Sequence, residues 1–132
     1  MKGHFPEEET RMKKIKAFIY CRVLDEKARS LLDYQEKELT ELSQYLDMKV
    51  IACAKEVGGG KYFGTFAMQK LIHHIVVGNI DVVLVYDETR LAIYDDLYAE
   101  FQMICDKHDV DILTIDDLKS MIFANSIFNS HD

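Results

Sequence analysis

Short, almost wholly apolar stretches alternate with longer amphipathic stretches along most of the chain. The short stretches are typical of strands buried on both faces, and they predict strands at residues 15–23, 50–54, 80–86 and 110–115. The longer stretches repeat apolar residues at helical spacing and predict helices at residues 30–46, 66–77 and 94–108. A last helix, running through Met121 and Ile122, is expected to have Asp116 or Asp117 as its N-cap.

The regular alternation of strand and helix predicts an α/β fold. Right-handed crossover connections then give three layers, with a mainly parallel sheet of four or five strands and helices on both of its faces. We expect the flavodoxin-like strand order 2-1-3-4. Residues 15–132 are expected to form a single domain behind a polar leader at residues 1–14, in which Met12 is a candidate for the natural start.

The expected strand order brings two arginines to one crevice. Arg22 lies at the end of the first strand and Arg90 follows the third, and ligands of such sheets bind where the strand order reverses. Two guanidinium groups there favour a phosphate or carboxylate ligand, because each offers paired donors to an oxyanion. A loop arginine is otherwise solvated or paired with a neighbour such as Asp25 or Asp87, and the sequence leaves both interpretations open.

Composition narrows the class of partner. The 132 residues are 48% hydrophobic and 30% charged, as in one globular domain, and no apolar run approaches the roughly 18 residues that cross a membrane. The net charge of −7 repels phosphate backbones, so we expect DNA to be bound weakly at most, and not by this chain alone. Cys21, Cys53 and Cys105 lie in apolar stretches and are expected to be buried, reduced thiols of a cytoplasmic protein.

The sequence gives no reason to expect a cofactor or a metal ion. The GGGK segment at residues 58–61 lacks the first glycine and the Ser/Thr of a phosphate-binding P-loop. His73 and His74 are adjacent on a predicted helix and therefore point about 100° apart, with no third ligand evident. The carboxylates at residues 87–88 and 95–96 could hold a divalent cation near Arg90, but such groups are more often solvated.

Five segments of the sequence are similar, in order and spacing, to one protein family. They are YCRV at residues 20–23, SLLDYQ at 30–35, KEVGGG at 55–60, GNIDVVLVYDETRLA at 78–92 and VDILTIDD at 110–117. On these segments, over about residues 15–117, the chain resembles the catalytic domain of the serine recombinases, the resolvase/invertase family. The resemblance implies a site-specific recombinase that acts in DNA recombination and DNA integration. In that family a serine hydroxyl attacks a DNA phosphodiester inside a pocket of arginines.

The resemblance also assigns residues to that pocket. Arg22 and Arg90 match two of its arginines, and Gln35 matches a glutamine on the first helix. Glu56 falls where the family often has an acidic residue, and Gly60 matches the glycine of that loop. These five residues would form a vestigial phosphate pocket.

Several positions depart from the family pattern. Leu24 stands where the nucleophilic serine is expected, and a leucine has no hydroxyl to form the covalent link. Gly59 replaces a serine of the second loop, while Thr65 and Ile93 replace arginines. The loss of one oxyanion stabiliser alone costs on the order of 100- to 1,000-fold in rate, so we expect no strand cleavage. Ser30 is expected to cap the first helix rather than to replace the nucleophile.

The end of the chain departs from the family as well. Family members continue into a long helix and a separate DNA-binding domain, whereas this sequence ends at Asp132, so no C-terminal DNA-binding domain is expected. The apolar residues near the end are expected either to fold back on the sheet or to meet a partner, and a homodimer through them is one hypothesis. An active recombinase is the other partner that we consider. The apolar residues are Met121, Ile122, Phe123, Ile127 and Phe128.

Three functional hypotheses follow. The first is a catalytically degenerate recombinase-type domain, acting as a regulatory or partner-binding protein or persisting as a remnant of a mobile element. The second is a small module that binds a phosphorylated metabolite or nucleotide through Arg22 and Arg90. The third is an active enzyme with an unrecognised nucleophile, against which Leu24 is the main argument.

Overall fold

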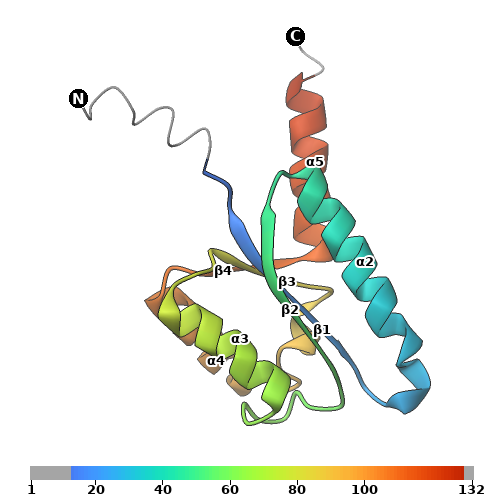
Figure 1. The fold of residues 1–132 in the computed structure, drawn as a ribbon, viewed down its shortest axis with the longest axis vertical. Helices are drawn as coiled ribbons and strands as arrows, with labels where there is room; N and C mark the ends of the chain where they lie inside the picture. Colours follow the sequence, from blue (N-terminus) through green and yellow to red (C-terminus); the bar gives the residue numbers. More distant parts are fainter. Residues whose placement is uncertain (1–12, 130–132) are drawn as a thin grey trace.

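A four-stranded parallel sheet with helices on both faces forms the protein (Figure 1). The computed structural model describes residues 13–129, with side chains as far as residue 127. The elements are β1 (Lys16–Val23), the 3-10 helix η2 (Glu26–Ala28), α2 (Ser30–Tyr45), β2 (Lys49–Val57), α3 (Phe66–Val77), β3 (Val82–Val85), the 3-10 helix η3 (Glu88–Arg90), α4 (Asp95–Lys107), β4 (Asp111–Thr114) and α5 (Ile115–Asn129). The strand order is β2-β1-β3-β4, which confirms the predicted α/β class and order. Residues 1–12, most of the expected leader, lie outside the described residues.

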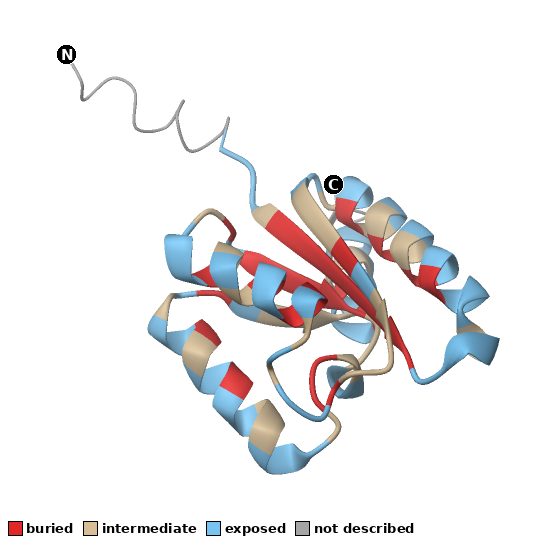
Figure 2. Cartoon of the chain, turned by 60° about the horizontal axis from the view of Figure 1, so that its bottom comes forward, coloured by how far each residue is buried: buried red, intermediate tan, exposed pale blue. Residues whose placement is uncertain are grey.

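Two hydrophobic cores lie on opposite faces of the sheet. Side chains of β1 alternate between them, because successive residues of a strand point to opposite faces. Phe18 and Tyr20 pack with α3 and α4, whereas Ile19 and Cys21 pack with α2 and α5. Figure 2 shows the central strands as the most buried part of the molecule. The carboxyl ends of β1, β2 and β3 are thereby fixed at one edge of the sheet.

The second strand is longer than predicted. The sequence indicated residues 50–54, but β2 continues past them and pairs with the end of β1 as far as Val57. The polar residues of this extension have partners. Lys55 donates hydrogen bonds to Asp33 and Glu36 of α2, at 3.1 and 2.8 Å, and these bonds raise the pKa of its ammonium group. The other element boundaries, apart from those of α5, agree with the prediction to within two residues.

The last helix begins earlier than predicted. α5 follows β4 without a loop, and its N-cap is Thr114 rather than Asp116 or Asp117. The Thr114 hydroxyl oxygen accepts a hydrogen bond from the Asp117 amide at 3.2 Å, and the Asp117 carboxylate accepts one from the Thr114 amide at 2.9 Å. This reciprocal pair is a capping box, so the last residue of the strand also starts the helix. None of the helices in the part described is long and apolar enough to cross a membrane.

Candidate functional site

Arg22 lies near the carboxyl end of β1, in contact with the two loops that follow the neighbouring strands β2 and β3. One loop, residues 58–60, follows β2, and the other contains η3 after β3. Arg22 has only 3% of its surface exposed, although its side chain carries a full positive charge. Burial lowers the pKa of its guanidinium, and the positive charge of Arg90 lowers it further.

The Arg22 guanidinium is bound by backbone carbonyl groups of both loops. Nε donates to the carbonyl oxygen of Arg90 at 2.8 Å, and Nη2 donates to that of Thr89. Nη1 donates to the carbonyl oxygens of Gly58 and Gly59, each at 3.3 Å. Since a guanidinium has five N–H groups, these contacts use most of its donors. Arg22 therefore joins the two loops to each other.

The glycine loop has a conformation that suits this contact. Gly58, Gly59 and Gly60 all have φ angles near +80°, in the left-handed region that favours glycine. A Cβ atom on Gly60 would lie 2.8 Å from Cζ of Arg22. The Ile93 amide donates to the Gly60 carbonyl at 2.8 Å, which ties this loop to the segment after η3.

Gln35 and Arg90 satisfy the backbone of Arg22. The Gln35 side chain is buried; its oxygen accepts from the Arg22 amide at 3.3 Å and its nitrogen donates to the Arg22 carbonyl at 3.2 Å. Nη1 of Arg90 donates to the same carbonyl at 3.1 Å. The register between β1 and β3 ends at Ile19 and Leu84, so these side chains replace a strand partner at this point.

Arg90 lies closer to the surface than Arg22. Its Nε is 3.4 Å from the Asp87 carboxylate, but that atom is buried and makes no hydrogen bond among residues 13–127. Its guanidinium carbon lies 5.9 Å from the centre of the Tyr86 ring, a distance at which a cation interacts with the π system. Arg90 thus retains donor capacity, whereas Arg22 is largely committed to the loops.

Glu56 belongs to a separate hydrogen-bond network beside the arginines. It pairs with Arg22 in the sheet register, and its carboxylate accepts hydrogen bonds from the Tyr20 hydroxyl and, at 3.2 Å, from the Thr65 hydroxyl. Burial and the neighbouring Glu56 carboxylate raise the pKa of Tyr20 well above its usual range. Thr65 is also the N-cap of α3, through its contact with the Met68 amide at 3.2 Å. This network fixes the start of α3 against β2.

The two candidate nucleophile positions are Leu24, just after β1, and Ser30, at the start of α2. Leu24 follows β1 and leaves 69% of its surface exposed. Ser30 is the first residue of α2, and the N-cap position belongs to Arg29, which makes no side-chain cap. The prediction that Ser30 caps this helix is therefore wrong. The reason is that η2 leads directly into α2, so the backbone is already helical at Arg29.

The structure brings four of the predicted pocket residues into contact and places the fifth beside them. Arg22 contacts Gln35 and Arg90 by hydrogen bonds and lies so close to Gly60 that a Cβ added there would be 2.8 Å from its Cζ, while Glu56 is its neighbour on β2. Sequence reasoning did not foresee that loop carbonyl groups would take the Arg22 donors. The run of three glycines was the available signal, because it allows a backbone that presents its carbonyl groups inward.

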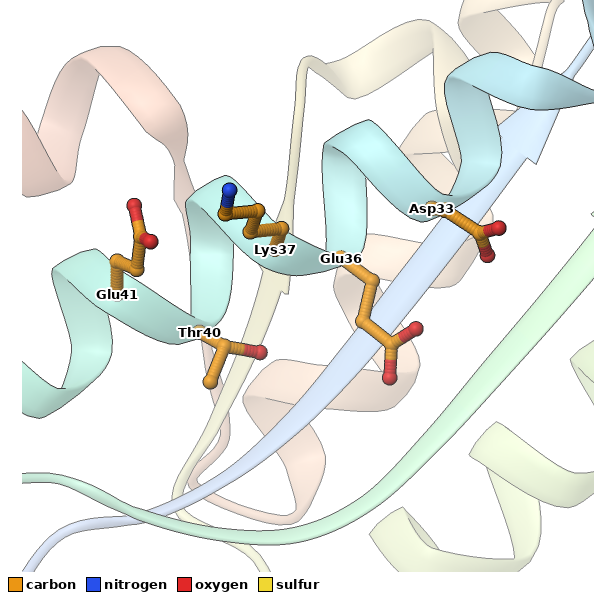
Figure 3. Close-up of a pocket in the computed structure, with 5 residues that line it drawn as sticks. All are labelled: Asp33, Glu36, Lys37, Thr40 and Glu41. Atoms are coloured by element: carbon orange, nitrogen blue, oxygen red, sulfur yellow. The ribbon is translucent and has the colours of Figure 1, made fainter.

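An open hollow of about 400 Å³ lies along α2, and no arginine is among its lining residues. Its lining residues are Asp33, Glu36, Lys37, Thr40 and Glu41. Figure 3 shows that Asp33 and Glu36 point to the same side of α2, the side on which Lys55 of β2 binds both. Carboxylates would repel a phosphate here, so the hollow is no alternative to the two arginines as a phosphate site.

The cysteines differ in burial. Cys21 and Cys105 are buried, but Cys53 is only half-buried, which corrects the expectation that all three are core thiols. The difference follows from the position of β2 at the edge of the sheet, where one side of the strand has no neighbour. Within residues 13–127, no group of three or more His, Cys, Asp or Glu side chains could hold a metal ion.

Comparisons with known proteins give one matching family model and several similar solved structures. The family model described as resolvase, N terminal domain, matches residues 17–127. The C-terminal catalytic domain of ISC1926 TnpA, an IS607-like serine recombinase, has a TM-score of 0.72 at 24% identity, over 76% of this chain and 67% of that chain. The N-terminal catalytic domain of TP901-1 integrase has a TM-score of 0.67 at 24% identity, over 88% of this chain and 95% of that chain. A resolvase family site-specific recombinase from Streptococcus pneumoniae has a TM-score of 0.69 at 20% identity, over 89% of each chain.

Proposed function

Because the chain belongs to the resolvase family, we propose that it is a recombinase-type domain that no longer cleaves DNA and acts through protein partners. It has the fold of a serine recombinase catalytic domain. In this proposal the domain keeps the fold and a vestigial phosphate pocket but does not react with phosphodiesters.

The observation that carries the proposal is Leu24. If the resemblance in sequence holds at this position, the nucleophilic serine of the family corresponds to Leu24, two residues after Arg22, and the leucine side chain is 69% exposed. An exposed position of this kind has room for a reacting hydroxyl, but leucine supplies no oxygen to attack phosphorus. Ser30 does not fill the role in this proposal, because it lies on the first turn of α2 instead of directly after β1.

The contacts of Arg22 support the same proposal. An arginine that stabilises a transition state must direct its donors at the reacting phosphate. Here four of the donor contacts of Arg22 are to the carbonyl groups of the two loops. The same contacts weigh against a small-phosphate module at Arg22 and Arg90, since only Arg90 keeps free capacity.

The partner we propose is a second copy of this chain, bound through α5. Met121 and Ile122 of this helix are half-buried, and Phe123 has 66% of its surface exposed. An exposed aromatic ring next to other apolar side chains is favourable to bury against a partner. Phe128, which the sequence placed in the same apolar segment, lies outside the residues whose side chains are described.

A covalent-adduct assay tests the loss of cleavage. The full chain is incubated at low salt with a duplex library of random sequence, and DNA that remains attached after denaturation in detergent is measured. The TP901-1 integrase, with its own site added to the library, gives the positive signal. We expect no adduct with the wild-type chain, and an adduct would overturn the proposal.

Leu24→Ser tests the state of the pocket, with Leu31→Ser as a matched control at another exposed leucine. We expect no adduct from either variant, because Thr65 and Ile93 occupy positions where the family has arginines. Adduct formation by Leu24→Ser alone would show an intact pocket that lacks only its hydroxyl, and would overturn the argument that the Arg22 donors are unavailable to a phosphate.

A further inference from the structure

Four lysines line a hollow at the amino-terminal end of β1 and β2, the opposite end of the strands from Arg22. The lining residues are Lys13, Lys14, Lys16, Met48 and Lys49, and the hollow has a volume of about 660 Å³. We call this feature the lysine hollow. Its volume is within the range of about 300–1,000 Å³ that is typical of small-molecule sites.

The topology of the sheet explains why these lysines converge. Lys16 and Lys49 are the first residues of β1 and β2, and they are paired in the register of the two parallel strands. The Lys49 amide donates to the Ile15 carbonyl at 2.8 Å, which holds the two strand ends together. Figure 1 shows that both strands start on the side of the sheet away from the loops at their carboxyl ends. At about 3.3 Å per residue, Lys16 is roughly 20 Å from Arg22 along the strand.

The positive charge of the hollow is only partly compensated. Lys14 forms an ion pair with Asp47 at 3.1 Å, and the Asp81 carboxylate accepts a hydrogen bond from the Lys16 amide at 2.8 Å. The side chains of Lys13 and Lys49 are exposed and make no hydrogen bond or ion pair within the residues described. Counting four lysines against two aspartates leaves a local charge of about +2, in a chain whose net charge is −7.

We propose that the lysine hollow binds a ligand that carries at least two phosphate charges. Ammonium groups bind phosphate as compact point charges, without the planar geometry that arginine requires. Several of them around one hollow attract a multivalent anion more strongly than a monovalent one, because each contact adds to the others. The buried Met48 side chain forms an apolar part of the wall. The site is independent of the proposed loss of DNA cleavage, which concerns the other end of the sheet.

The test compares two phosphate sources and two pairs of substitutions in the full chain. Sodium tripolyphosphate represents a free polyphosphate, and a short duplex of arbitrary sequence represents the phosphodiester backbone; binding is measured by titration calorimetry and by fluorescence anisotropy at low salt. The variant Lys13→Gln/Lys49→Gln removes two exposed charges of the hollow without breaking a described contact. The variant Lys37→Gln/Lys107→Gln removes two exposed charges elsewhere and is the matched control.

We expect the first variant to bind more weakly by about 25-fold, since a contact between unit charges about 4 Å apart in water contributes about fivefold in affinity. The control should bind within about twofold of wild type, and rising salt should weaken the wild-type affinity. Binding of tripolyphosphate, of the duplex or of both supports the site and identifies the source of the phosphate. Absence of binding to both, or an equal loss in the control, would overturn the proposal.

Discussion

At the scale of single residues, Arg22 shows how a buried charge can organise backbone. Its guanidinium is withdrawn from water and satisfied by carbonyl groups of the two loops, with Gln35 and Arg90 satisfying its own backbone. A hydrogen bond to a charged group contributes about 1.5–3 kcal/mol, and an unpaired buried charge costs more than that. The loops after β2 and β3 should therefore hold or lose their conformation together.

Gly60 gives the sharpest test of this contact. Alanine at Gly60 combines the strain of a left-handed backbone with a Cβ that would lie 2.8 Å from the Arg22 guanidinium carbon. Alanine at Gly58 has the same strain, at a φ angle of +82°, but no atom within 4 Å of the added Cβ. We expect Gly58→Ala to lower the free energy of unfolding by about 1–2 kcal/mol, and Gly60→Ala by about 3 kcal/mol. Urea unfolding measures both, and equal effects would contradict the role given to Arg22.

The cysteines allow a second test with single-residue resolution. A hydrogen bond from the Cys21 thiol lowers the pKa of Cys53, while burial raises the pKa of Cys105 to about 12. Since the thiolate is the reactive form, iodoacetamide at pH 8 should alkylate Cys53 at least about tenfold faster than Cys21 or Cys105. Mass spectrometry of the labelled peptides measures the rates. In Cys53→Ser the fast phase should disappear; comparable labelling of Cys105 in the folded protein would contradict the assignment.

The meeting of Arg22 with Arg90 could be predicted from the sequence, because strand order alone brings the ends of β1 and β3 together. The hydrogen bonds from the Arg22 guanidinium to the loop carbonyl groups could not be predicted. Carbonyl groups are present at every residue, so a sequence carries no mark of which ones turn inward. The three glycines indicated only that the loop is free to adopt unusual backbone angles.

At the scale of elements, the end of β2 and the start of α5 were predicted wrongly, and both boundaries contain polar residues. The apolar run that predicted β2 ends before Lys55, yet the strand continues. Lys55 binds two carboxylates of α2, and Glu56 accepts hydrogen bonds from two hydroxyl groups. α5 was predicted to begin two or three residues too late, because Asp116 and Asp117 are of a type that commonly caps helices. For β2 the partners are distant in sequence, so a local pattern does not contain them, whereas α5 begins at a local capping box between Thr114 and Asp117.

The capping box of α5 can be tested by removing one hydroxyl group. Thr114→Ala leaves the Asp117 amide without its acceptor, and the cost should be about 1 kcal/mol in the free energy of unfolding. Thr114→Ser keeps the hydroxyl and should lie within about 0.5 kcal/mol of wild type. Denaturant unfolding followed by circular dichroism gives both values. A cost as large in the serine variant as in the alanine variant would show that packing of the threonine methyl group, rather than the cap, stabilises this junction.

At the scale of the whole molecule, the two faces of the sheet differ in what they leave uncovered. α3 and α4 cover one face, and α2 and α5 cover the other. The first turns of α5 are anchored by the buried side chains of Ile115 and Leu118, whereas Phe123, further along, is mostly exposed. Burial of this part of α5 in a second copy would extend the hydrophobic core across a symmetric interface.

Phe123→Glu tests that interface in the full chain. The wild type should show a dimer mass by light scattering at high concentration, with dissociation on dilution. A carboxylate in place of the ring should weaken association by on the order of 30-fold, because a buried aromatic anchor contributes about 2 kcal/mol and an unpaired charge in its place adds a desolvation cost. The melting temperature of the dilute protein should change little, since Phe123 is exposed in the monomer.

Met103→Glu is the matched control for this substitution. Met103 has 70% of its surface exposed, close to the value for Phe123, but it belongs to α4 on the other face of the sheet. If α5 forms the interface, Met103→Glu should dimerise as the wild type does, because the added charge remains in water on the far side of the molecule. A monomeric wild type at high concentration would remove α5 as the interface. An equal loss in both variants would instead attribute the association to general charge repulsion in a chain that already carries −7.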